Sequence, residues 1–142
     1  MIFARKKRRI ERLLVVEDEP LVAFDTEYFL TDAGFQIVAT VDRVAEARAL
    51  IEGGAAIDLV LVDIRLADGS GIDVARAAQD RGVPVLFVTG NLPPEATEVA
   101  HGFLPKPFAQ RDLLAAIMAI DGQLTGKPPK RLPAGMTLFE RT

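Results

Sequence analysis

Several apolar runs of this chain end in residues whose side chains could do chemistry together. The set combines three acids, one hydroxyl and one amine: Glu17, Asp18, Asp63, Thr89 and Lys106. Clustered carboxylates repel one another unless a cation lies among them. Carboxylate oxygens, without Cys or His, are ligands that suit Mg²⁺. A lysine and a hydroxyl beside such a metal are what a phosphoryl group needs during transfer, with one carboxylate as the nucleophile that forms an acyl phosphate.

The pattern of the surrounding residues predicts a fold that brings these side chains together. Apolar runs of strand length alternate with segments of helical periodicity, and the strands are apolar on both faces. This order predicts a doubly wound α/β fold with a five-stranded parallel sheet and helices on both faces. Ligands in such sheets bind beyond the carboxyl ends of the strands, which is where the acids and the lysine fall. The predicted strands span residues 12–18, 35–41, 57–64, 83–90 and 103–108.

The predicted helices fill the intervals between these strands. Gly34 is the expected stop of the first helix, and Asp42 is the candidate N-cap of the second. Phe24, Tyr28 and Phe29 have helical spacing, which we interpret as core packing. The helices are expected within residues 19–35, 42–54, 71–82, 93–102 and 109–120, of which the segment 93–102 is the weakest.

Composition and charge divide the chain into three parts. Residues 12–122 form one domain, since 142 residues suit a single core. Residues 1–11 form a basic arm, and residues 1–12 carry six basic side chains against one acid. Residues 123–142 form a tail rich in Gly and Pro, in which no regular element is expected.

The same features limit the function classes. Cysteine is absent, so disulfides and cysteine-based zinc sites are excluded. No apolar run approaches the roughly 20 residues that span a bilayer, and the start lacks a small-residue cleavage site, so a cytoplasmic protein without membrane insertion is expected. Nucleic-acid binding is not favoured, because the basic arm is short and the body, residues 13–120, has seven basic against seventeen acidic residues.

Four segments together resemble a known family. "VVEDEP", "LVLVDIRLADGSGID", "PVLFVTG" and "FLPKPF" are similar to the signatures of the receiver domain of two-component response regulators. The resemblance covers roughly residues 12–121 and includes the order of the strand ends. It implies a flavodoxin-like fold of the receiver type, and it implies a signalling module rather than a general enzyme. Such a module assists only its own Mg²⁺-dependent phosphorylation and dephosphorylation.

The resemblance also implies roles for individual residues. Asp63 would accept the phosphoryl group from a phosphohistidine on a histidine kinase or a histidine phosphotransfer protein. Asp18 would bind Mg²⁺ directly, and Glu17 would bind it directly or through water. Asp63 and the backbone carbonyl of Arg65 would complete the metal site.

The remaining family positions concern the switch. Thr89 would move toward the phosphoryl group and Lys106 would pair with it. Phe103 falls where the family keeps an aromatic side chain that turns inward when the threonine moves. Gly71 matches the glycine of the loop after the phosphorylated strand, and the family often has a cis peptide between the lysine and the following proline.

Some positions depart from the family pattern. Ala67 stands where a proline is common, and Gly90 stands where alanine is usual. The interval between Thr89 and Lys106 is short and holds two prolines, so the fourth helix is expected to be short, shifted or mobile. "FVTG" also resembles the "Phe-Ala-Thr-Gly" run of a subgroup of single-domain receivers.

These inferences predict a stand-alone receiver that is phosphorylated on Asp63 and signals by changed protein–protein binding. One alternative is a receiver-like module that binds partners without phosphorylation. Another is a phosphatase of the haloacid-dehalogenase type, although the D-x-D-x-T motif of that family is missing here. Glu19, Asp68 and Asp73 are interpreted as helix-start or turn residues rather than ligands.

Overall fold

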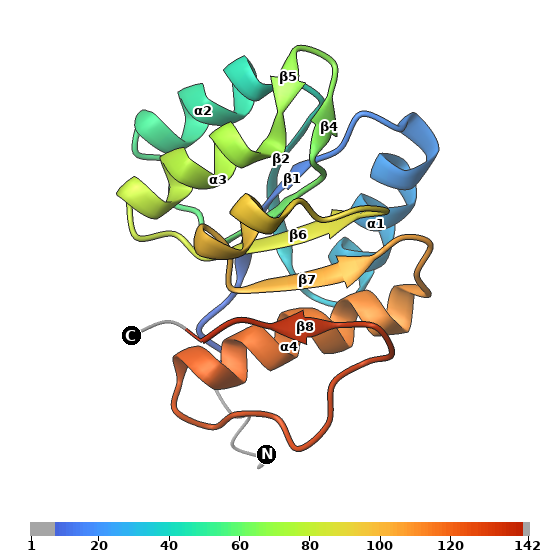
Figure 1. Cartoon of the computed structure of the whole chain (residues 1–142). Helices are drawn as coiled ribbons and strands as arrows, with labels where there is room; N and C mark the ends of the chain where they lie inside the picture. The colour runs from blue at the N-terminus through green and yellow to red at the C-terminus, as the bar shows by residue number, and fades with distance from the viewer. Residues whose placement is uncertain (1–7, 141–142) are drawn as a thin grey trace.

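The computed structural model describes residues 8–140, and Figure 1 shows their arrangement. Residues 1–7 of the predicted basic arm lie outside the described range. A single six-stranded sheet forms the centre of the molecule, and a small hairpin and the helices surround it. The strands are β1 (Arg12–Val16), β2 (Gln36–Val41), β3 (Leu59–Val62), β4 (Arg65–Leu66), β5 (Gly69–Ser70), β6 (Val85–Thr89), β7 (Gly102–Pro105) and β8 (Thr137–Leu138). The helices are α1 (Pro20–Asp32), α2 (Val44–Glu52), α3 (Gly71–Asp80), the 3₁₀ helix η1 (Pro94–Glu98) and α4 (Gln110–Leu124).

The strand order of the sheet is β2-β1-β3-β6-β7-β8. The first five of these strands are parallel, as the sequence predicted. Two predictions are wrong, namely a sheet of five strands and a tail, residues 123–142, without a regular element. Strand β8 lies in that tail, pairs antiparallel with β7 and adds a sixth strand to the sheet. Two residues among glycines and prolines are too few to show a strand period, so this strand has no signal in the sequence.

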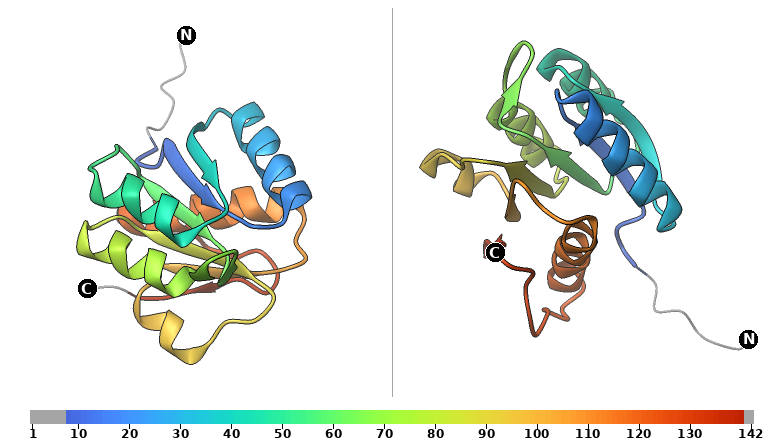
Figure 2. Two further views of the ribbon diagram at one scale, coloured as in Figure 1. Left: turned by 90° about the horizontal axis from the view of Figure 1, so that it is seen from above. Right: turned by 90° about the vertical axis from the view of Figure 1, so that its right-hand side faces the viewer.

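Helices cover both faces of the sheet, as the two views of Figure 2 show. Alternate residues of the central strands point to opposite faces. Leu13 and Val15 of β1 therefore pack in one core cluster with α1 and α4 residues, whereas Leu14 and Val16 pack in the other with α2 and α3 residues. This division explains why the central strands read as continuous apolar runs.

Two carboxylates fix the start of the described chain. Asp121 of α4 is buried and accepts hydrogen bonds from the backbone N–H groups of Arg9 and Ile10, both at 2.8 Å. Asp58 accepts from the N–H groups of Glu11 and Arg12 at 2.9 and 2.8 Å. These four bonds satisfy backbone donors at the entry to β1, and they thereby help to set the position of that strand.

The cap of α2 comes from a distant residue, so the predicted N-cap is wrong. The residue before the helix is Arg43, and Asp42 precedes it. The side chain of Asp68, in the turn between β4 and β5, accepts hydrogen bonds from the N–H groups of Val44 and Ala45 at 2.6 and 3.1 Å. These bonds hold the pKa of the Asp68 carboxyl below its usual range. The turn interpretation of Asp68 is confirmed, and the turn also caps a helix.

The interval between β6 and β7 confirms the expectation of a short fourth helix, since it holds the five-residue η1. The predicted core packing of α1 is wrong for two side chains. Phe24 and Tyr28 are 67% and 70% exposed, and their rings stack on each other with centroids 6.4 Å apart. Phe29 packs partly buried against the α1/α4 cluster. None of the helices described is long and apolar enough to cross a membrane.

Candidate functional site

The strand ends bring the predicted acids together at one edge of the sheet. The last residues of β1 and β3, Val16 and Val62, are paired, so the residues that follow them are neighbours. The Asp63 N–H donates to the Val16 carbonyl at 3.1 Å. One ligand oxygen from each of Glu17, Asp18 and Asp63 lies within 4.8 Å of the others. The parallel register therefore builds a cluster of three carboxylates from two distant segments.

Lys106 lies in the middle of this acidic cluster. Its ammonium is 2.8 Å from Oδ2 of Asp63, from Oε1 of Glu17 and from Oε1 of Glu19. The interpretation of Glu19 as only a helix-start residue is therefore incomplete, because its carboxylate pairs with Lys106 across 87 residues. Helix α1 starts directly after Glu19 and directs this third acid toward the cluster. The three adjacent acids at 17–19 were the signal for it.

The second oxygens of two acids are also held. Glu17 Oε2 accepts a hydrogen bond from the Glu19 N–H at 3.1 Å, and Asp63 Oδ1 accepts from the Ile64 N–H at 2.6 Å. Both carboxylates are buried. Their orientation is therefore set by the backbone and by Lys106 together, and this leaves little rotational freedom to lose when a ligand binds.

Burial and charge shift two pKa values in the cluster. Burial raises the pKa of Glu17 above its usual value, although the hydrogen bond from Lys106 opposes this. Burial alone would lower the pKa of Lys106, but its hydrogen bonds to Asp63, Glu17 and Glu19 together raise it. Lys106 is therefore a permanent cation at neutral pH. Three carboxylates pair with this one ammonium and Asp18 lies in the same cluster, so the site has an excess of negative charge that suits a further cation.

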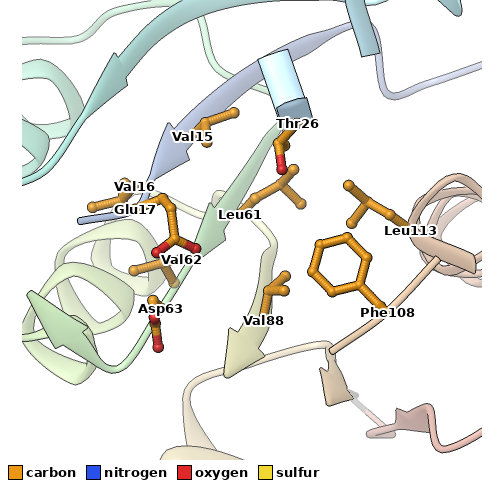
Figure 3. Close-up of a pocket in the computed structure, with 10 residues that line it drawn as sticks. All are labelled: Val15, Val16, Glu17, Thr26, Leu61, Val62, Asp63, Val88, Phe108 and Leu113. Atoms are coloured by element: carbon orange, nitrogen blue, oxygen red, sulfur yellow. The ribbon is translucent and has the colours of Figure 1, made fainter. Parts of the chain in front are cut away.

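The floor of the site is apolar. Figure 3 shows Glu17 and Asp63 at one end of a small buried pocket whose other walls include Val88, Phe108 and Leu113. Water-excluding surroundings strengthen charge interactions above the floor. The same surroundings desolvate Glu17, which is the main cause of its raised pKa.

An open cleft of about 600 Å³ lies above the acids. Asp18, Asp63, Arg65, Thr89 and Lys106 all line it. Gly90, Asn91 and Pro93 of the loop after β6 also line this cleft. This space is large enough for a phosphoryl group, and the acids, the lysine and the threonine all line it.

The structure places the two predicted switch residues on adjacent strands. Thr89 is the buried last residue of β6, and its carbonyl accepts a hydrogen bond from the Lys106 N–H at 3.0 Å. Phe103 of β7 pairs with Phe87 and is half-buried against the α2/α3 cluster. The peptide between Lys106 and Pro107 is cis, as the family resemblance implied. The predicted roles of all these site residues in phosphorylation, metal binding and switching stay predictions.

Gly71 lets the loop after β3 fold back on the acceptor residue. A Cβ atom at position 71 would lie 1.9 Å from the backbone oxygen of Asp63. The Gly71 N–H donates to the Ile64 carbonyl at 2.7 Å. Only glycine permits this approach, so Gly71 positions the backbone of Asp63.

Comparisons with known proteins agree with this geometry. The family model for the response regulator receiver domain matches residues 13–118. The sensory transduction protein RegX3 of Mycobacterium bovis is 33% identical over 115 residues, which cover 76% of this chain and 49% of that protein. The chain spans about half the length of the curated relatives it matches.

Solved structures show the same fold. The CheY-like receiver domain protein of Methanospirillum hungatei superposes with a TM-score of 0.72 at 28% identity, over 82% of this chain and 98% of that one. A response regulator receiver protein of Sinorhizobium medicae gives a TM-score of 0.67 at 30% identity, over 82% of this chain and 95% of that one. The chain therefore belongs to the family of response regulator receiver domains.

Proposed function

We propose that this receiver accepts a phosphoryl group on Asp63 from a phosphohistidine of a histidine kinase or histidine phosphotransfer protein. The observation that carries the proposal is the placement of Asp63. Its carboxylate lies in an open cleft, 2.8 Å from the Lys106 ammonium, and has an oxygen within 4.8 Å of an oxygen of each of two further acids. Packing alone does not require four charged side chains of this kind to meet at a strand edge.

A Mg²⁺ ion is part of this proposal. The donor set fits a hard divalent cation, because Glu17, Asp18 and Asp63 offer carboxylate oxygens within 4.8 Å of one another. Arg65 lines the same cleft, and its backbone carbonyl is the proposed fourth ligand from the protein. When bound, the ion supplies positive charge that offsets the excess of acids and neutralises phosphoryl oxygens.

The proposed reaction is an in-line displacement at phosphorus. An oxygen of the Asp63 carboxylate forms the new O–P bond while the P–N bond of the phosphohistidine breaks. The electron pair of that bond stays on the imidazole, which leaves as a neutral ring because its other nitrogen carries a proton. The Lys106 ammonium pairs with the oxygens of the transferred phosphoryl group, and the Thr89 hydroxyl donates a hydrogen bond to one of these oxygens. Hydrolysis of the acyl phosphate by water returns Asp63 and inorganic phosphate.

Helix α1 offers a docking surface for the phosphodonor. Leu21, Phe24 and Tyr28 are 79%, 67% and 70% exposed and recur at a spacing that places them on one side of the helix. A further cavity of about 410 Å³ lies between α1 and the chain after β7. Val22 of α1 and Lys106, which follows β7, both line this cavity. An apolar patch on the helix that begins directly after the acidic cluster suits a partner that must bring its histidine to Asp63.

The signal would be a change in which proteins this receiver binds. Phosphorylation shifts the population toward the form that holds the phosphoryl group better through Thr89 and Lys106. A stand-alone role, a cytoplasmic location and catalysis limited to its own phosphorylation and dephosphorylation belong to the same proposal.

Intact-mass measurement tests this proposal. The protein is incubated with acetyl phosphate and Mg²⁺, and the wild type is expected to gain the mass of one phosphoryl group. The Asp63→Asn variant is expected to gain none, while the control Asp73→Asn, an exposed acid in the first turn of α3, gains it normally. Absence of any gain with several donors would favour a module that binds without phosphorylation.

A further inference from the structure

The C-terminal strap, residues 126–140, is seated on the sheet edge by several independent contacts. Strand β8 pairs with β7, and the Phe139 N–H donates to the His101 carbonyl at 2.9 Å. Met136 is buried in the α1/α4 cluster. Leu138 packs against that cluster, whereas Phe139 packs against the α2/α3 cluster on the other face. Figure 1 shows strand β8 of the strap lying alongside β7.

Glycines in β7 and in the strap let these two segments approach each other closely. A Cβ atom on Gly102 of β7 would lie 3.2 Å from Cε of Met136 and 3.3 Å from the Thr137 carbonyl oxygen. A Cβ atom on Gly135, which has a φ of +80°, would lie 2.8 Å from Cγ of Pro105. The receiver body and the strap therefore fit each other closely, with little space for relative displacement.

The strap touches the part of β7 that leads into the phosphorylation site. Phe103, the predicted switch aromatic, pairs with Thr137. Pro105, which Gly135 contacts, pairs with Thr89 on the other side and directly precedes Lys106. One residue of β7 thus separates the strap from the lysine that holds Asp63.

The strand that attaches the strap to the sheet is short. Strand β8 has two residues, and the segment before it, residues 126–136, is a loop in which Leu132 is 40% exposed. Segments with few ladder bonds and long exposed connections open locally at small cost compared with the sheet centre. The strap can therefore exchange between docked and released forms while the five parallel strands stay folded.

We propose that docking of the strap and phosphorylation of Asp63 oppose each other. This inference rests on the proposed function. The Asp63 carboxylate and the Lys106 ammonium are 2.8 Å apart, so a phosphoryl group between them must displace Lys106. Pro105 directly precedes Lys106, so a shift of the Lys106 backbone also moves Pro105 and disturbs its close approach to Gly135. The docked strap thus favours the unphosphorylated form, and phosphorylation favours release, by reciprocity of linked equilibria.

Released, the strap uncovers the β7 edge and the apolar seat of Met136. The device therefore converts a charge change in the cleft into exposure of a sheet edge on another side of the molecule. An unpaired edge with an apolar seat is a surface that pairs with an extended segment.

The test uses beryllium trifluoride with Mg²⁺ as a stable mimic of the phosphoryl group on an aspartate. Fluorine NMR measures its binding directly, and hydrogen exchange measures opening of the strap. In the wild type we expect the amides of residues 134–140 to exchange about five-fold faster or more when the mimic is bound. The Met136→Asp variant, which removes the apolar anchor, is expected to bind the mimic about five-fold more tightly or better. The matched control Leu132→Asp changes an exposed residue of the same strap and is expected to bind like the wild type.

The outcomes separate this inference from the proposed function. Absence of a bound fluorine signal in the wild type would mean that the phosphoacceptor role itself fails. A normal signal with unchanged exchange at 134–140 and equal affinity in Met136→Asp would overturn the strap inference alone. Hydrogen exchange of the wild type needs no variant, so the result stands even if Met136→Asp fails to fold.

Discussion

Replacement of Gly71 by alanine is expected to damage both stability and phosphorylation. The added Cβ atom would lie 1.9 Å from the Asp63 oxygen and 2.9 Å from the Asp63 carbonyl carbon, where ordinary contact begins at 3.4 Å. The start of α3 and the end of β3 must therefore separate by about 1.5 Å, and the 2.7 Å hydrogen bond from the Gly71 N–H to Ile64 is strained or lost.

The magnitude follows from these two losses. Overpacking in a tight site costs about 1–3 kcal/mol, and a lost hydrogen bond costs about 0.5–1.5 kcal/mol. We expect a decrease in the free energy of unfolding of about 3 kcal/mol, which corresponds to roughly 10 °C in melting temperature for a domain of this size. Because Asp63 moves with its backbone, the rate of phosphorylation is expected to fall by about 10²-fold, as for a 1 Å misplacement of a reacting group.

Thermal denaturation and the time course of intact mass with acetyl phosphate measure both effects. Gly90→Ala is the matched control, since a Cβ atom at position 90 has nothing within 4 Å. This variant is expected to stay within about 0.5 kcal/mol of the wild type. If Gly71→Ala melted and reacted like Gly90→Ala, the assignment of Gly71 as the residue that positions Asp63 would be wrong.

Three further predictions concern charged side chains, two in the site and one at the entry to β1. Lys106→Met leaves its acidic partners without a cation, so in the absence of Mg²⁺ the free energy of unfolding by urea should fall by about 2 kcal/mol, less than the roughly 3–5 kcal/mol typical of fully buried pairs. Added Mg²⁺ should restore part of this loss, and a variant as stable as the wild type in EDTA would contradict the pairing. Burial raises the pKa of Glu17, so the contribution of this residue to stability is present below about pH 4.3 and is lost as pH rises through the raised pKa of the folded protein. Glu17→Gln should remove this decline of the free energy of unfolding with pH, measured by urea titration without metal. An unchanged pH profile in the variant would show that Glu17 is not the source of the decline. Asp121→Ala orphans the N–H groups of Arg9 and Ile10 and should cost about 2 kcal/mol by urea denaturation, whereas the exposed Asp80→Ala should cost almost nothing.

The central parts of the fold and site were predictable because they follow from local patterns. Apolar runs with no polar face indicated buried parallel strands, and the carboxyl ends of such strands share one edge. Glu17, Asp63 and Lys106 therefore meet as the sequence predicted. The family signatures then added roles that periodicity alone does not give.

The missed features depend on contacts between distant segments. Asp68 caps α2 from a turn 24 residues away, and no local rule selects it over Asp42. Phe24 and Tyr28 lie on a helix with apolar residues on several sides, so the spacing does not decide which side faces the core. The strap that carries β8 fits closely against Gly102 and Pro105, and this fit becomes visible only when β7 and the strap lie side by side.

Identification of the modified residue tests the central claim most directly. The wild type is treated with acetyl phosphate and Mg²⁺ and then reduced with borohydride, which converts an aspartyl phosphate into homoserine, and tandem mass spectrometry locates the product. We predict homoserine at position 63 alone and its disappearance when EDTA replaces Mg²⁺. Homoserine at position 18, or modification that is unchanged in EDTA, would contradict the assignment of Asp63 as the acceptor in a metal-dependent acidic site.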